Sequence, residues 1–294
     1  MKVLLTGGSG NVGTTVIECL RDRYDLTVFD KREPRASGVQ FIEGDFLDLD
    51  QITRAARGMR AIVHLGAIPH PMSDPPDRVM EVNLLGTYRT LMAAEANGIR
   101  RFVHASTDST LGFVFTKGKF CPEYVPIDEQ HPLRPDDSYG LSKMCCEQAC
   151  AAFTRITGMT TICLRYCWVW WEAIHYPNYH EIASDPASHW HQMWAYVDAR
   201  DVAQAIDLSL RARGLKHEVL FISAANTFYD IPSLELVSTY LPDTKSVRNP
   251  AQFAEDPYRA LFDIAKARRL LGYEPKYNWR DIAKPQRRPK GRGK

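Results

Sequence analysis

The chain has 294 residues, of which 45% are hydrophobic and 24% charged, and this composition excludes a disordered, collagen-like or low-complexity protein. The formal net charge is +2, but six of the 37 basic residues fall in the last eleven positions. Residues 1–283 therefore carry 31 basic against 35 acidic side chains, and this mildly acidic body argues against a general nucleic-acid-binding surface.

Short β-branched runs alternate with longer helical patterns through the first 165 residues. The expected strands are 2–6, 26–30, 39–43, 61–65, 101–105 and 160–165, and the expected helices between them are 12–20, 49–57, 77–97 and 139–157. This alternation predicts an α/β fold of the Rossmann type, a doubly wound parallel sheet with helices on both faces. Ligands of such folds bind at the carboxyl ends of the strands.

The rhythm changes after residue 165. Residues 166–194 are rich in Trp, Tyr, His and Pro, which is typical either of the wall of a substrate pocket or of a surface loop. A helix over 199–212, a strand over 219–223 and helices over 233–240 and 263–271 are expected to follow. These later elements predict a small C-terminal part that completes the fold.

A glycine-rich turn directly follows the first expected strand and opens the first expected helix. In the sequence TGGSGNVG, small residues at Gly7, Gly10 and Gly13 let the backbone approach a pyrophosphate. The start of the helix, at Asn11 and Val12, offers free N–H groups to the same phosphates. The turn therefore predicts a dinucleotide-binding site.

Further cofactor contacts are expected at the ends of the next strands. Asp30 ends the second strand, where a carboxylate accepts hydrogen bonds from the ribose hydroxyls and repels a 2′-phosphate. NAD is therefore favoured, while the adjacent Lys31 and Arg32 leave NADP possible. Asp45 is expected to reach the adenine amino group. The other positions expected to line the cofactor are Phe46, Leu65 and Ala67.

A phenol and an ammonium group lie four residues apart in one expected helix, at Tyr139 and Lys143, and so share a face. The ammonium and the positively charged nicotinamide ring favour the phenolate, which lowers the pKa of Tyr139 from its usual value near ~10. Thr107 and Ser109 follow the fifth strand at the same edge of the sheet. Their hydroxyls can hydrogen-bond a substrate oxygen beside Tyr139.

Together these features resemble the extended short-chain dehydrogenase/reductase family, in its epimerase/dehydratase branch, over about residues 1–280. The resemblance rests on the glycine turn, Asp30, Gly44-Asp45, HLGA at 64–67, Asn83 with Gly86-Thr87, Ser106-Thr107, YGLSK at 139–143, Arg165 and YVDARDV at 196–202.

The resemblance implies roles for individual residues. Tyr139 would be the catalytic acid/base, Lys143 would bind the nicotinamide ribose and lower the pKa of the phenol, and Thr107 would be the catalytic hydroxyl. Asn83 would join the cofactor-binding residues and support the site through backbone contacts. The substrate contacts expected on this basis are Ser109, Trp168 and Trp170.

Three reactions share this scaffold. Dehydratases of the family carry Thr-Asp-Glu where this chain has Thr107, Asp108 and Ser109, so the base that elimination needs is missing. Nucleotide-sugar epimerases have a long segment that grips the diphosphate, whereas here only 32 residues separate Arg165 from Asp198 and none of them is Lys or Arg.

The short segment resembles the branch that oxidises free sugars or sugar acids, such as uronate dehydrogenases. We therefore predict an NAD(P)-dependent oxidoreductase that transfers hydride at a hydroxyl or carbonyl of a sugar or sugar acid. A nucleotide-sugar epimerase that uses transient oxidation by bound NAD is the alternative. A non-catalytic NAD(P)-binding regulator is the second alternative.

The predicted organisation is an NAD(P)-binding Rossmann domain over 1–165, a substrate-binding part over 166–283 interleaved with the last strand and helices, and a basic disordered tail over 284–294. Seven cysteines without metal-ligand spacing, and no signal peptide or apolar run of ~20 residues, indicate a cytoplasmic protein without a metal, a membrane or a nucleic acid as partner. A small sugar-type molecule is the expected partner. A homodimer is also expected, from the apolar side chains Leu84, Leu91, Met92, Met144 and Phe153 on two helices.

Overall fold

A parallel sheet of seven strands lies at the centre of the computed structural model, which describes residues 1–118 and 120–282. The strand order is β3-β2-β1-β4-β5-β6-β9, which confirms the doubly wound α/β fold expected from the sequence. The tail expected over 284–294 lies outside the described residues. The strands are β1 (Lys2–Thr6), β2 (Asp25–Asp30), β3 (Gln40–Glu43), β4 (Ala61–His64), β5 (Arg101–Thr107), β6 (Thr160–Tyr166) and β9 (His217–Ile222).

The central strands are buried on both faces, as parallel strands between two helical layers must be. In β1, Val3, Leu4 and Leu5 are all fully buried, so the run needs no polar alternation. At the end of β1, Thr6 is paired with Phe29 of β2 and His64 of β4. The turns that follow these three strands therefore emerge side by side at one edge of the sheet.

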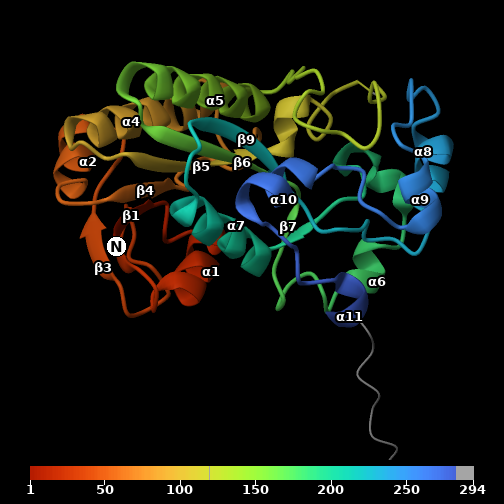
Figure 1. Ribbon diagram of the computed structural model, residues 1–294, viewed down its shortest axis with the longest axis horizontal. Helices are drawn as coiled ribbons and strands as arrows, with labels where there is room; N and C mark the ends of the chain where they lie inside the picture. The colour runs from red at the N-terminus through yellow and green to blue at the C-terminus, as the bar shows by residue number, and fades with distance from the viewer. Residues whose placement is uncertain (119, 283–294) are drawn as a thin grey trace, which may run out of the picture.

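Two layers of helices cover the sheet (Figure 1). One layer holds α2 (Leu49–Ala55), α4 (Gly86–Ala96) and α5 (Ser138–Thr157), and the other holds α1 (Asn11–Leu20), α7 (Ala199–Arg211) and α10 (Ala265–Leu271). Because α7, α10 and β9 follow residue 165, the C-terminal half supplies part of the Rossmann layers.

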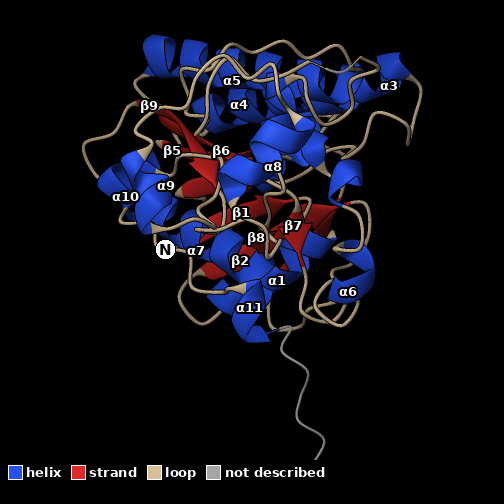
Figure 2. Cartoon of the chain, turned by 90° about the vertical axis from the view of Figure 1, so that its right-hand side faces the viewer, coloured by secondary structure: helices blue, strands red, loops and turns tan. Residues whose placement is uncertain are grey.

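A second, smaller body lies beyond one end of the sheet, at the right of Figure 1, and faces the viewer in Figure 2. Its core is aromatic, and Trp170, Trp194, Tyr196 and Phe228 are fully buried in it. The aromatic segment therefore forms a core rather than a surface loop. The elements here are β7 (Val169–Trp170), α6 (Tyr179–Ile182), η3 (Pro186–Ser188), η4 (Trp190–Gln192), β8 (Val197–Asp198), α8 (Ser233–Tyr240), α9 (Ala251–Glu255) and α11 (Trp279–Ile282).

The helix expected over 77–97 forms with a change of pitch. It consists of α3 (Pro76–Met80), a π-helical turn η1 (Glu81–Leu85) and α4. Turns of this kind are rare and are often found at functional sites. Here the π turn contains Asn83, which is fully buried beneath the loop that follows β4.

A buried ion pair fixes α5 on the sheet. Arg165 of β6 donates to Glu147 of α5 from Nε to Oε1 at 2.8 Å and from Nη2 to Oε2 at 2.7 Å. Ser106 of β5 donates its hydroxyl to the same carboxylate at 2.6 Å. The guanidinium and the carboxylate are 3% and 1% exposed. The helix is thereby tied to two neighbouring strands at one register.

We expect Glu147→Ala to lower the free energy of unfolding by about 3–5 kcal/mol, because it leaves the Arg165 guanidinium charged and buried without its partner. Urea unfolding followed by circular dichroism measures the change. The matched control is Arg268→Ala, which breaks an exposed ion pair with Glu274 and should cost less than about 1 kcal/mol. A loss for Glu147→Ala as small as the control would show that the buried pair does not hold the helix.

Candidate active site

A cleft of about 490 Å³ lies at the edge of the sheet where β1, β2 and β4 end. Apart from Trp171, the residues that line it are scattered over the first 82 positions of the sequence. The expected cofactor residues that line it are Gly7, Gly10, Asn11, Val12, Gly13, Asp30, Asp45, Phe46, Leu65 and Ala67. The structure thus brings the glycine turn and the three strand ends into one continuous site.

The floor of this cleft is bare backbone. Gly7 has a φ of +73°, and a Cβ placed on it would lie 2.4 Å from the backbone nitrogen of Gly66, so only glycine fits. Helix α1 begins at Asn11, directly after the turn, and its N-terminus carries a partial positive charge. A cradle of glycine backbone at a helix N-terminus fits the pyrophosphate of a dinucleotide.

Charged side chains occupy the outer part of the cleft. The Asp30 carboxylate accepts from the backbone N–H of Ser9 at 3.1 Å, which holds it at the end of β2. Lys31 forms an ion pair with Asp45 at 2.8 Å. Burial raises the pKa of Asp45, but Lys31 and the backbone N–H of Leu47 outweigh it and the net shift is downward. The Lys31 ammonium is therefore already paired with Asp45, whereas the Asp30 carboxylate lines the cleft, where it can meet a ribose.

A second cavity, of about 700 Å³, adjoins the cleft and holds the expected catalytic residues. Thr107, Tyr139 and Lys143 all line it, together with the expected substrate residues Ser109 and Trp168. The two cavities share a wall. The side chains that line both are Val12, Leu65, Ala67, Pro69 and Trp171.

The first turn of α5 carries Tyr139 and packs closely on the end of β5. Asp137 caps the helix by accepting from the backbone N–H of Gly140 at 2.8 Å. A Cβ on Gly140 would lie 2.5 Å from the carbonyl oxygen of Ser109, so a larger residue would push the helix away. The glycine after Tyr139 therefore lets the phenol approach the hydroxyls that follow β5.

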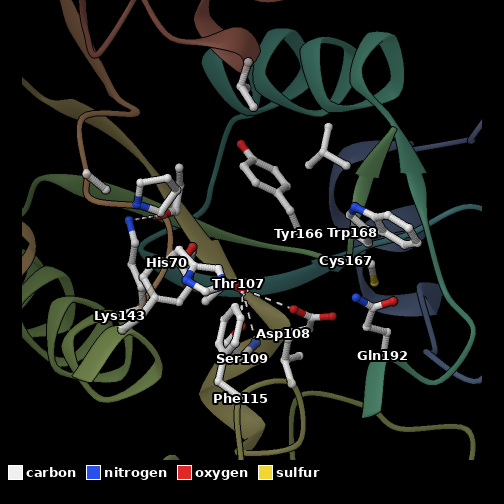
Figure 3. A pocket seen from close by; sticks show the side chains of 18 of the residues that line it. His70, Thr107, Asp108, Ser109, Phe115, Lys143, Tyr166, Cys167, Trp168 and Gln192 are labelled. Carbon is white, nitrogen blue, oxygen red and sulfur yellow. Dashed lines mark hydrogen bonds between the residues drawn. The ribbon is translucent and has the colours of Figure 1, made fainter. Parts of the chain in front are cut away.

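Hydroxyl and carboxyl groups are linked at this strand end (Figure 3). Thr107 Oγ1 donates to Asp108 Oδ1 at 3.1 Å and also lies 3.1 Å from Ser109 Oγ. One turn along α5 from Tyr139, Lys143 donates its ammonium to the carbonyl oxygen of Ala105 at 2.8 Å. The three side chains expected to be catalytic thus line one cavity at the end of β5.

Burial dominates the acid–base properties of these groups. It raises the pKa of Tyr139, and the opposing effect of the Thr107 side chain does not offset it. Burial lowers the pKa of Lys143. The lowered pKa expected for the phenol includes the charge of the nicotinamide ring. The protein groups alone raise this pKa, because the ring is desolvated.

Asp108 is a feature of the cavity to which the sequence analysis gave no role of its own. Its side chain is 5% exposed and lines the cavity. Burial raises its pKa to about 7, although the Thr107 hydroxyl and nearby backbone N–H groups favour the ionised form. The carboxyl group therefore changes charge near neutral pH.

Two expected site residues lie outside the cavities. Asn83 sits behind the cofactor cleft, where its amide exchanges hydrogen bonds with the backbone of Ile68 at 2.8 and 3.1 Å and donates to Ser142 at 3.0 Å. It supports the loop rather than lining the cleft. Trp170 is fully buried in the aromatic core, so it was wrongly expected to contact substrate. The neighbouring Trp171 lines both cavities instead.

Two further properties concern residues 1–118 and 120–282. Among them no group of three or more His, Cys, Asp or Glu side chains is arranged to hold a metal ion. Within the same residues no helix combines the length and the apolar character needed to cross a membrane.

Comparison with known sequences decides the family. The sequence profile described as the NAD dependent epimerase/dehydratase family matches residues 3–171, more than half of the chain. The chain belongs to the NAD dependent epimerase/dehydratase family. The match contains the glycine turn, the strand ends of the cleft, Thr107, Tyr139 and Lys143, and it confirms the resemblance seen in the sequence.

Two curated proteins similar to the chain are named for reactions on sugars. The chain is 34% identical over 173 residues to an L-arabinose 1-dehydrogenase (NAD(P)(+)) from Haloferax volcanii. This match covers 57% of the chain and 67% of the relative. The chain is 29% identical over 174 residues to a UDP-glucose 4-epimerase from Corynebacterium glutamicum, covering 56% and 50%. The matches thus span half to two thirds of these curated relatives.

The fold is shared over nearly the whole chain. The crystal structure of uronate dehydrogenase from Agrobacterium tumefaciens superposes with a TM-score of 0.69 at 21% identity, covering 99% of this chain and 92% of the other. The smaller body is therefore part of the same fold, although the family profile ends at residue 171.

We expect the protein to bind NAD more tightly than NADP, because the Asp30 carboxylate on the cleft wall repels a 2′-phosphate and Lys31 is paired with Asp45. Asp30→Ala should reduce the difference between the two affinities, because it should weaken the binding of NAD and strengthen the binding of NADP. Titration of both cofactors by calorimetry measures the two affinities. A wild-type preference for NADP would contradict this assignment and would point to Arg32 as a phosphate ligand.

Proposed function

We propose that the protein is a dehydrogenase that transfers hydride between NAD and a hydroxyl or carbonyl group of a free sugar or sugar acid. The observation that carries the proposal is the shared wall between the cofactor cleft and the cavity that holds Thr107, Tyr139 and Lys143. A substrate hydroxyl beside Tyr139 would lie next to the nicotinamide end of a cofactor bound in the cleft. The family assignment supports this arrangement.

The protein groups would bind, orient and deprotonate the substrate. The bound oxidised nicotinamide would supply the hydride acceptor and a positive charge. Tyr139 would remove the hydroxyl proton, and Thr107 would hold the same oxygen by a hydrogen bond. Lys143 would hold the ribose hydroxyls, and its ammonium would favour the phenolate.

The lining of the cavity favours a dehydrogenase over the other family reactions. Ser109 stands where a dehydratase needs a carboxylate base. The segment from Tyr166 to Ala199 contains no Lys or Arg that could meet a diphosphate. The L-arabinose 1-dehydrogenase matched by the chain supports net oxidation of a free sugar.

Epimerisation remains the second candidate, supported by the relative that is a UDP-glucose 4-epimerase. The two functions differ in the fate of the cofactor. A dehydrogenase releases one NADH for each sugar oxidised, whereas an epimerase keeps its cofactor and shows no net reduction. Absorbance at 340 nm with a panel of free sugars, sugar acids and nucleotide sugars separates them. Cofactor binding without turnover of any kind would favour a non-catalytic NAD(P)-binding regulator.

We expect Tyr139→Phe to reduce kcat by ~10²–10⁴-fold, because the ring is kept while the acid/base group is lost. Its folding and its affinity for NAD should stay close to those of the wild type. Steady-state kinetics and calorimetry measure the two effects. Near wild-type turnover would show that Tyr139 is not the base.

Lys143→Met should both slow the reaction and weaken NAD binding. At saturating NAD the rate should rise with pH through an apparent pKa below that of a free tyrosine, about 10, because the oxidised nicotinamide adds its positive charge to that of the Lys143 ammonium. Removal of the ammonium should move this apparent pKa upward. A pH profile unchanged by the substitution would exclude Lys143 from the ionisation of the phenol.

We further propose that the protein acts in the cytoplasm and as a homodimer formed by α4 and α5. Leu91 and Phe153 were wrongly expected at the dimer interface, because both are buried against the sheet. The exposed large apolar side chains of η1, α4 and α5 are Leu85, Tyr88, Met92, Leu141 and Ile156. Two neighbouring helices with such a surface can pair with a second copy about a two-fold axis.

We expect light scattering to give twice the mass of one chain, and Tyr88→Arg combined with Met92→Arg to give a single chain, because two charges would be buried at the interface. Val247→Arg, which adds a charge at an exposed apolar position away from these helices, is the matched control and should remain a dimer. A wild-type mass equal to one chain at every concentration would refute the dimer.

A further inference from the structure

We infer that the substrate cavity is built for an uncharged sugar, whose hydroxyl groups are held by Asp108 on one side and Gln192 on the other. This inference rests on the proposed function and names the class of substrate. It separates neutral sugars from uronates, sugar phosphates and nucleotide sugars, all of which carry a negative charge. The charges and the unpartnered polar atoms of the cavity wall support it.

The wall offers no cation that is free to meet an anion. Among the described residues that line the cavity, Lys143 is the one lysine, and none is arginine. Its ammonium is already engaged, because it donates to the carbonyl oxygen of Ala105 at 2.8 Å. A carboxylate or phosphate placed in the cavity would lose its water without gaining an ion pair.

The two histidines of the wall do not replace that cation. Nδ1 of His70 accepts from the backbone N–H of Met72 at 3.1 Å, so this nitrogen is engaged with the backbone. Burial lowers the pKa of His191, which keeps that ring neutral at pH 7. Burial also raises the pKa values of Tyr166 and Cys167, so the phenol and the thiol are neutral as well.

The one carboxyl group of the wall, among the described residues, would repel an anion. Asp108 follows β5 and faces the cavity beside Thr107 (Figure 3). Carboxylates are strong acceptors for sugar hydroxyls, and each oxygen can accept more than one hydrogen bond. Asp108 therefore favours a ligand that brings hydroxyl hydrogens and disfavours one that brings negative charge.

Unpartnered polar atoms complete the argument. Gln192 Oε1, Tyr166 Oη and Trp171 Nε1 are buried and have no hydrogen-bond partner within the described structure, and all three residues line the cavity. Buried polar groups are nearly always paired, and a ligand that brings both donors and acceptors would supply the partners that these three lack. All three are uncharged. Hydroxyl groups satisfy them, whereas a carboxylate satisfies only the donors.

Asp108 and Gln192 come from different bodies of the fold. Asp108 belongs to the 3₁₀ turn η2 (Asp108–Leu111) that follows β5, and Gln192 ends η4 in the smaller body. In Figure 3 their carboxylate and carboxamide point toward the same part of the cavity, next to Trp168. Asp108 and Gln192 would thus bind hydroxyl groups of one sugar from two sides. The indole ring of Trp168 would pack against the C–H groups of the sugar ring.

The test compares sugars that differ only in charge. Galactose with galacturonate, glucose with glucuronate, and arabinose with arabinose 5-phosphate form matched pairs. We expect the wild type to favour the neutral member in kcat/KM by at least about tenfold at pH 8, because the charged member leaves buried groups unpaired. A uronate or phosphate preferred over its neutral partner would overturn the inference and leave the dehydrogenase function standing.

Two variants distinguish charge from hydrogen bonding. Asp108→Asn keeps the shape but removes the charge, so it should lower kcat/KM on neutral sugars and raise the relative rate on uronates by about tenfold. Gln192→Leu should lower kcat/KM on neutral sugars without any gain on uronates. Calorimetry with NAD and thermal unfolding verify that both variants fold. An unchanged ratio of uronate to neutral sugar in Asp108→Asn would contradict the role of the carboxylate.

The pH dependence supplies a readout that a purely structural role would not give. Since the pKa of Asp108 is raised to about 7, discrimination against uronates should be full above this pH and weaken as the pH falls through it and the carboxylate is protonated. In Asp108→Asn the same ratio should be flat. A wild-type ratio without this pH dependence would count against the inference.

A binding series keeps the inference separate from the reaction. In Tyr139→Phe with NAD bound, quenching of the fluorescence of Trp168 and Trp171 by each sugar reports affinity without turnover. Tighter binding of neutral sugars supports the inference even if no sugar is oxidised, in which case the proposed function alone fails. Equal or tighter binding of uronates, or no binding of any sugar, overturns the inference.

Discussion

The register of α5 on the sheet is the constraint on which the site depends. Tyr139, Lys143 and Glu147 lie at intervals of four residues on this helix, and Glu147 is held by Arg165 and Ser106 from two adjacent strands. A buried charge without its partner is costly, so a helix shifted by one turn would leave both the carboxylate and the guanidinium unpaired. The same pairing that orders the interior therefore also sets the distance of the phenol from the end of β5.

The part of the fold that local sequence determines could be predicted. The glycine turn, the buried strands and the helices of the first 165 residues each have a local pattern, and the parallel order follows from their alternation. Thr107 and Tyr139 could be placed together because strand ends and helix starts share one edge of a parallel sheet. The contacts that fix their distance, such as Gly140 against Ser109, depend on packing between segments and carry no local signal.

The aromatic segment shows why the rest could not be predicted. The sequence alone does not distinguish which of Trp168, Trp170 and Trp171 faces a substrate. In the structure the two-residue strand β7 places Trp170 in the core, whereas Trp168 and Trp171 line a cavity. Gln192 gave no signal, because a single glutamine in an irregular segment has no pattern. Leu91 was wrongly expected at the dimer interface, because α4 has apolar residues both on the side that packs on the sheet and on its exposed side, and the sequence does not show which side Leu91 is on.

Trp171 gives the two cavities a common boundary, and this has a thermodynamic consequence. A side chain that contacts two ligands transmits the occupancy of one site to the other, and such coupling is reciprocal. A dinucleotide in the cleft would fix one face of the indole and thereby complete the wall against which a sugar packs. The affinity for a sugar would then depend on whether the cleft is occupied, and the affinity for the dinucleotide would depend on the sugar by the same factor.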